Sequence, residues 1–124
     1  MEKTALLISD QLQDLNRMKN WFPKGITVKG VNAFSAVPAA LRSELPSLII
    51  IRVREFEDFF SAYEAIRTTS VTENVPIIAI ADLAIGDALK ENVDLKETTL
   101  MGSSVTDGYM IRIISDAMGI HNKE

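Results

Sequence analysis

Short apolar runs alternate along the chain with stretches in which apolar residues recur at helical spacing. Five of these runs predict buried strands, at residues 4–9, 26–31, 47–53, 75–81 and 98–102. The second run alternates apolar with polar positions, which indicates a strand nearer an edge of the sheet. Parallel pairing is expected, because the segments between the runs are long enough for helical crossovers.

Each segment after a predicted strand carries an apolar stripe with the period of a helix. The stripes are Leu12, Leu15, Met18 and Trp21; Val37, Leu41 and Leu45; Phe56, Phe59, Phe60, Tyr63 and Ile66; Ile85 and Leu89; and Val105, Tyr109, Met110, Ile113, Ile114 and Met118. Ser35 is the expected N-cap of the second helix, and Thr106 or Asp107 begins the last one.

Five repeats of strand and helix predict a doubly wound α/β fold. The crossovers are right-handed and cover both faces of a parallel sheet, giving a three-layer sandwich. The expected strand order is the flavodoxin-like order 2-1-3-4-5. Residues 1–124 form one domain, with a polar tail from about residue 120.

The composition argues against several kinds of binding site. The chain has 124 residues, 17 acidic and 13 basic, no cysteine and one histidine, His121, in the polar tail. This balance lacks the basic footprint of a nucleic-acid binder, and it offers no disulfide or thiolate metal site. The apolar runs, Leu48–Ile51 among them, are far too short to span a membrane. We therefore expect a soluble, cytoplasmic protein that holds no metal or cofactor and contacts neither nucleic acid nor membrane directly.

In this architecture ligands bind beyond the carboxyl ends of the strands. The residues expected there are Ser9 and Asp10, Arg52 and Arg54, Ala81 and Asp82, and Gly102 and Ser103. The sequence contains no glycine-rich phosphate loop and no nucleophile elbow. Because these positions supply no nucleophile–base pair, an enzyme of flavodoxin-like fold is the least favoured interpretation, and no catalytic residue is expected.

Four local phrases carry a resemblance to a known family. They are "TALLISD", "LRSELPSLIIIRV", "NVPIIAIAD" and "VTDGYMIRII". Together with the element order and the size, they make the chain resemble, along nearly its whole length, the receiver domain of two-component response regulators. The resemblance implies a flavodoxin-like fold and a role in signal transduction or a phosphorelay.

The resemblance also implies where the family's phosphorylation site falls. The phosphoacceptor Asp corresponds to Arg52, and the acidic pair that holds Mg²⁺ corresponds to Ser9 and Asp10, or to Asp10 and Gln11 if the register shifts by one. The Thr or Ser after the fourth strand corresponds to Ala81. The Lys and the Pro after it correspond to Gly102, or alternatively Met101, and to Ser103.

Only Asp10 keeps the family's chemistry at these positions. Arginine is cationic at ordinary pH and is no nucleophile, so an aspartyl phosphate cannot form at Arg52. The sequence therefore resembles a degenerate receiver, a pseudo-receiver. We expect Arg52 to pair with Asp10, and with Asp82 if it reaches, in the space of Mg²⁺ and phosphate. The alternative is that Arg52 points into solvent.

Two functional hypotheses follow. The first is phosphorylation-independent protein–protein interaction, with a kinase, an output domain, another regulator or a second copy of the chain as partner. The family's signalling face implies that the surface includes Asp87, Lys90, Ser104, Tyr109 and Met110. The second is a sensor of a small anion or metabolite, bound by Arg52, Arg54 and the "GSS" turn at 102–104, although that turn is more simply a loop before the last helix.

Overall fold

The structure is a computed structural model that describes residues 3–43 and 45–119. Its sheet has five parallel strands in the order β2-β1-β3-β4-β5, which confirms the predicted topology. The strands are β1 (Lys3–Ile8), β2 (Ile26–Val31), β3 (Leu48–Val53), β4 (Ile77–Ala81) and β5 (Thr98–Gly102). Each lies within a residue or two of its predicted range. His121 and the rest of the predicted polar tail lie outside the described residues.

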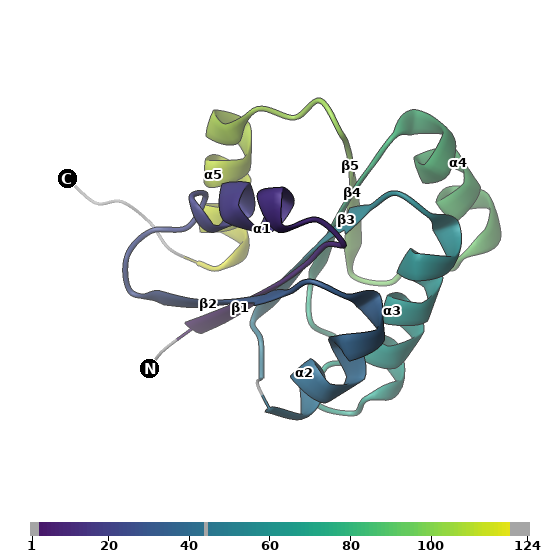
Figure 1. Ribbon diagram of the computed structural model, residues 1–124, viewed down its shortest axis with the longest axis horizontal. Helices are drawn as coiled ribbons and strands as arrows, with labels where there is room; N and C mark the ends of the chain where they lie inside the picture. The colour runs from purple at the N-terminus through teal and green to yellow at the C-terminus, as the bar shows by residue number, and fades with distance from the viewer. Residues whose placement is uncertain (1–2, 44, 120–124) are drawn as a thin grey trace.

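The helices cover both faces of the sheet, as predicted. They are α1 (Leu12–Lys19), α2 (Val37–Ser43), α3 (Phe56–Thr68), α4 (Leu83–Asn92) and α5 (Asp107–Ala117), with a 3₁₀ turn η1 (Phe34–Ala36) before α2. Figure 1 shows α1 and α5 together on one side of the sheet and α2, α3 and α4 on the other. Two apolar cores result, one on each face. None of the described helices is long and apolar enough to cross a membrane.

The central strand β3 separates the two cores. Ile49, Ile51 and Val53 pack toward α2, α3 and α4, whereas Leu48 and Ile50 pack toward α1 and α5. Because successive side chains of a strand point to opposite faces, the next residue after Ile51 lies on the side of α1 and α5. This alternation brings a charged side chain, that of Arg52, to the edge of a core that is otherwise apolar.

Two details of the helices differ from prediction, and one is confirmed. Ser35 lies inside the 3₁₀ turn and is not the N-cap of α2. Leu45 lies beyond the end of α2 and is 68% exposed, because Pro46 follows and disfavours further helix. Thr106 is the N-cap of α5, where its hydroxyl accepts a hydrogen bond from the amide of Tyr109.

Candidate functional site

The carboxyl ends of β1 and β3 are joined by the side chain of Arg54. Its Nη1 donates to Asp10 Oδ1 at 3.1 Å and to Asp14 Oδ2 at 2.7 Å. Asp10 lies two residues after the end of β1, and Asp14 lies in the first turn of α1. One guanidinium therefore holds two carboxylates, with 28% of the Arg54 side chain exposed.

Asp14 is the most constrained carboxylate of the site. It also accepts a hydrogen bond of 2.7 Å from the hydroxyl of Ser9, which is fully buried and in turn accepts from the Gln11 amide. Burial alone would raise the pKa of Asp14. The hydrogen bonds from Arg54 and Ser9, and the charges of Arg54 and Arg52, outweigh burial and lower it. The hydrogen bond to Asp14 likewise raises the pKa of Arg54.

Arg52 turns toward β4 instead of β1. Its Nη1 donates to the carbonyl oxygens of Val53 at 2.9 Å and of Ile80 at 3.2 Å. Its Nη2 lies 3.7 Å from Asp82 Oδ1, a distance for an ion pair but not for a good hydrogen bond. The Arg52 side chain is 17% exposed and that of Asp82 is 62% exposed.

The predicted pair of Arg52 with Asp10 is therefore wrong, while the approach of Asp82 to Arg52 is confirmed. The register explains the change of partner. Ile8 is aligned with Ile51, so two further residues place Asp10 level with Val53, next to Arg54. Arg52 is aligned with Ile80 on the other side of β3, which is why its guanidinium meets acceptors of β4.

A second polar cluster ties α1 to the start of α5. Arg17 Nε donates to Asp107 Oδ1 at 2.8 Å, and its Nη2 donates to the Val105 carbonyl at 3.0 Å. The indole of Trp21 donates to the same Asp107 oxygen at 2.7 Å, and the Arg17 guanidinium lies 5.4 Å from the Trp21 ring centroid. The hydrogen bonds from Trp21 and then Arg17 lower the pKa of Asp107.

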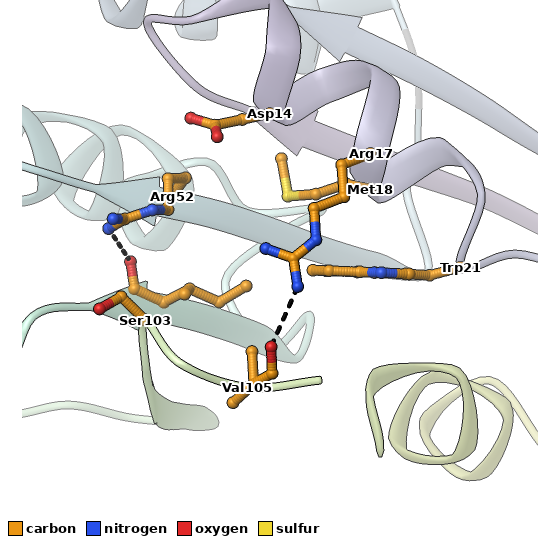
Figure 2. A pocket seen from close by; sticks show the side chains of 8 residues that line it. Asp14, Arg17, Met18, Trp21, Arg52, Ser103 and Val105 are labelled. Atoms are coloured by element: carbon orange, nitrogen blue, oxygen red, sulfur yellow. Dashed lines mark hydrogen bonds between the residues drawn. The ribbon is translucent and has the colours of Figure 1, made fainter. Parts of the chain in front are cut away.

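A small hollow lies between these two clusters. Its volume is about 20 Å³, enough for about one water molecule. The lining residues are Asp14, Arg17, Met18, Trp21, Arg52, Ile80, Ser103 and Val105. Figure 2 shows Arg52 and Ser103 on one side of the hollow and Arg17, Met18 and Trp21 on the other.

The remaining predicted pocket residues lie at the ends of β4 and β5. Ala81 is buried, Asp82 precedes α4, and Gly102 ends β5. Together with residues of α4 they line a second, more open cavity of about 100 Å³. Its members are Ala81, Asp82, Leu83, Gly86, Asp87, Lys90, Leu100, Met101 and Gly102. Arg52 and Ser103 line the first hollow, whereas Ser9 and Asp10 line neither of the two, so the predicted pocket residues do not form one pocket.

The predicted interaction surface is exposed at four of its five positions. Asp87, Lys90 and Ser104 are exposed, and Tyr109 is 50% exposed. Met110 is fully buried in the core beside α1, so its assignment to the surface was wrong. The helical period explains this, because Met110 shares its inner face with Ile114 four residues later.

The site does not fit a divalent metal. The two carboxylates nearest the end of β1 are both hydrogen-bonded to Arg54, and a second guanidinium lies beside them. Within residues 3–43 and 45–119, no group of three or more His, Asp or Glu side chains is arranged to hold a metal ion. A cation would have to displace Arg54 from Asp10 and Asp14 and tolerate Arg52.

Comparison with known proteins bears on the fold. No protein-family model matches the sequence, and no curated protein matches it. Solved structures do match. A response regulator from Hahella chejuensis is 18% identical, with 98% of this chain and 99% of that chain covered and a TM-score of 0.78. A signal receiver domain of an HD domain-containing protein from Pseudomonas fluorescens is 15% identical, with 96% of each chain covered and a TM-score of 0.77.

The chain has the receiver fold of response regulators. A third match is the receiver domain of a sensor histidine kinase from Pseudomonas aeruginosa, solved with a magnesium ion in its active-site cleft. It is 18% identical, covers 96% of this chain and 99% of that chain, and has a TM-score of 0.74. The resemblance inferred from the sequence is thus confirmed at the level of the receiver fold.

Sequence reasoning missed Asp14 as a member of the site. A usable signal was present, because the first turn of a helix that follows a parallel strand lies at the carboxyl edge of the sheet. Asp14 is four residues after Asp10, so both carboxylates reach the same edge. The cluster of Arg17, Trp21 and Asp107 gave no such signal, since Asp107 lies 90 residues from Arg17 and 86 from Trp21 in the chain.

Proposed function

We propose that this chain is a pseudo-receiver, a signalling domain of the two-component type that works by protein–protein interaction without phosphorylation. The observation that carries the proposal is the bond of Arg54 to both Asp10 and Asp14. These contacts satisfy the carboxylates with a tethered cation, which leaves them unsuited to recruiting Mg²⁺.

Arg52 supports the proposal from the other side of the site. By the family resemblance it stands where a receiver carries its phosphoacceptor, and a guanidinium cannot accept a phosphoryl group. Nothing at Ala81 or Gly102 supplies the hydroxyl or the ammonium that would stabilise transferred phosphoryl charge. The site therefore lacks the phosphoacceptor, the hydroxyl and the ammonium that phosphoryl transfer to a receiver requires.

These contacts favour a single conformation of the strand ends, one that needs no phosphorylation. Arg54 links the end of β3 to α1, while Arg52 links it to the end of β4 and to Asp82 before α4. In this proposal the protein's own guanidiniums hold the strand ends in one state. Partners then recognise the exposed surface around Asp87, Lys90, Ser104 and Tyr109, and regulation acts through the amount or availability of the partner.

The proposal is tested by exposing the protein to acetyl phosphate with Mg²⁺. We expect no mass increase of one phosphate in intact-protein mass spectrometry. We also expect no change in the amide NMR spectrum on addition of beryllofluoride with Mg²⁺. A receiver with an intact phosphoacceptor, treated alongside, shows that the reagents are active. A saturable Mg²⁺-dependent response of this chain at millimolar Mg²⁺ would overturn the proposal.

The interaction surface is tested by affinity capture with a kinase or response regulator encoded with this chain. The charge reversal Lys90→Glu on α4 is expected to weaken capture about tenfold, because it changes the sign of an exposed charge on the proposed surface. Lys19→Glu is the matched control, since it reverses an exposed lysine at the end of α1. Equal losses in both variants would show that binding follows net charge and not this surface.

A further inference from the structure

One edge of the Arg52 guanidinium makes no hydrogen bond with the described residues. All of its hydrogen bonds come from Nη1, which donates to the carbonyls of Val53 and Ile80. The Nε and Nη2 edge is the one that binds planar anions in a bidentate manner. The nearest carboxylate in the described chain is that of Asp82, 3.7 Å from Nη2 and itself largely in water, while Asp14 lies farther away and acts on Arg52 through its charge.

The charge of Arg52 is therefore less well compensated than that of its neighbours. Arg54 has two hydrogen-bonded carboxylates, and Arg17 has one, Asp107. Arg52 has none and is the least exposed of the three, at 17% against 28% for Arg54 and 48% for Arg17. A half-buried guanidinium with a free edge favours an anion more than an exposed one does.

The surroundings of Arg52 supply the other parts of a small anion site. Arg17 brings a second guanidinium to the same hollow, and Ser103 brings a hydroxyl that has no hydrogen bond with the described residues. Trp21 and Met18 supply apolar walls. A few converging polar groups in an apolar hollow are typical of small-molecule sites.

We propose that this hollow binds the carboxylate head of a small monocarboxylic acid, with Arg52 as the bidentate partner and Ser103 as a donor. The hollow of about 20 Å³ admits about one oxygen atom, so one carboxylate oxygen enters it and the second lies at its mouth. Asp14 also lines it, and its negative charge disfavours dianions. The rest of the acid lies outside the hollow, beyond its mouth.

This proposal is independent of the absence of phosphorylation. It would hold if the domain were phosphorylated elsewhere, and it can fail while the pseudo-receiver proposal stands. The two are also tested with different reagents, carboxylic acids here and phosphoryl donors with Mg²⁺ there.

The test follows the arginine Nε–Hε and tryptophan indole signals by ¹⁵N NMR while butyrate is added at constant ionic strength. Trp21 is the only tryptophan of the chain, so its indole signal needs no assignment. We expect saturable shifts of the Arg52 Nε and Trp21 indole signals, with a dissociation constant on the order of 1–10 mM, as for a fragment of a few heavy atoms. Butyramide, a neutral analogue of nearly the same shape, should shift neither signal.

Variants separate a built site from general attraction of anions. Arg52→Lys should weaken butyrate binding about tenfold, because the lysine ammonium cannot form the bidentate contact. Ser103→Ala should weaken it severalfold and is expected to leave the fold intact, since that hydroxyl has no hydrogen bond in the described chain. Arg112→Lys, an exposed arginine on α5, is the matched control and should change nothing.

Three outcomes would overturn the proposal. The first is the absence of a saturable shift with butyrate up to about 100 mM, well above the expected dissociation constant. The second is an equal response to butyrate and to inorganic phosphate, which would indicate an adventitious ion only. The third is equal weakening by Arg52→Lys and Arg112→Lys.

Discussion

Arg67 at the amino end of the sheet and Arg54 at its carboxyl end bind different groups. At the amino end, Arg67 of α3 donates only to backbone carbonyls, those of Thr72, Val75, Lys96 and Glu97. At the carboxyl end, Arg54 donates only to side-chain carboxylates, those of Asp10 and Asp14. Carbonyl acceptors do not titrate, whereas carboxylates do.

The amino end is also closed by an aromatic residue. The Arg67 guanidinium lies 5.4 Å from the ring centroid of Tyr63, whose hydroxyl donates to the Asp94 carbonyl at 2.9 Å and accepts from the Lys96 amide at 2.7 Å. These contacts tie α3 to the segment between α4 and β5. The difference between the ends teaches that the contacts of Arg67 do not depend on a titrating acceptor, whereas those of Arg54 depend on the charge of two carboxylates.

The largest expected change in stability follows from removing Arg67 at the amino end of the sheet. Arg67→Ala should lower the free energy of unfolding by about 3 kcal/mol, because several carbonyls lose a charged donor at once. Chemical denaturation followed by circular dichroism measures this loss. Arg112→Ala, which removes an exposed arginine of α5, should change stability by less than about 0.5 kcal/mol.

The pH dependence separates the two ends further. The loss caused by Arg67→Ala should be constant between about pH 4 and pH 8, since the acceptors of Arg67 among the described residues are carbonyls, which do not titrate. If the loss of unfolding free energy varied with pH over this range, Arg67 would not act through carbonyl acceptors alone.

The next largest change in stability is expected at Asp14, which binds Arg54 and Ser9 at the carboxyl end of the sheet. Asp14→Asn should destabilise the protein by about 2 kcal/mol at pH 7, because Arg54 and Ser9 lose their charged acceptor, with an allowance for partial exposure. The pKa of Asp14 is lower in the folded chain than in the unfolded chain. Its contribution is therefore complete above the unfolded pKa of about 4 and is lost as the pH falls through the folded pKa.

Denaturation curves at several pH values measure this dependence. The difference between wild type and Asp14→Asn should shrink as the pH is lowered below about 4. Asp116→Asn, at an exposed position of α5, is the matched control and should show no such difference at any pH. A difference that stays the same down to about pH 2 would show that the charge of Asp14 is not what stabilises the cluster.

The sequence predicted the fold far better than the site, and the reason is physical. Strands such as the one containing Leu48–Ile51 are buried, and a buried strand appears in the sequence as a short run of apolar residues. The choice between Arg52 and Arg54 as the partner of Asp10 depends on the register of β1 against β3. Arg52 and Arg54 are two residues apart, and a shift of two residues leaves every side chain on its own face, so the alternation of apolar and polar positions does not distinguish them.

The sequence predicted where the site residues lie more accurately than it predicted their hydrogen bonds and ion pairs. Arg52, Asp82 and Ser103 were expected at the carboxyl edge and are found there. The pairing of Arg17 with Asp107 joins two helices that are far apart in the chain, so it follows only from the finished fold. Met110 was misplaced because Tyr109 and Met110 are neighbours, and only the helix rotation decides which one is buried.

A smaller effect tests the hydroxyl that supports Asp14. Ser9→Ala should cost about 1 kcal/mol, because the buried hydroxyl both donates to Asp14 and accepts from the Gln11 amide. Combined with Asp14→Asn, it should cost less than the sum of the two single changes, because both remove the same hydrogen bond. Ser61→Ala, at an exposed position of α3, is the control. Additive losses would mean that Ser9 and Asp14 act separately.

The smallest effect is expected at Asp82, and it bears most directly on Arg52. Asp82→Asn should change the free energy of unfolding by less than about 0.5 kcal/mol, because the carboxylate is 62% exposed and lies 3.7 Å from Arg52 Nη2. The measurement is the same denaturation curve at low and at high salt, where a strong pair would give a salt-dependent difference. A loss well above this value would show that Asp82 compensates Arg52 after all. The free edge of Arg52 would then be occupied by the protein's own carboxylate, and the carboxyl end would be braced as firmly as the amino end.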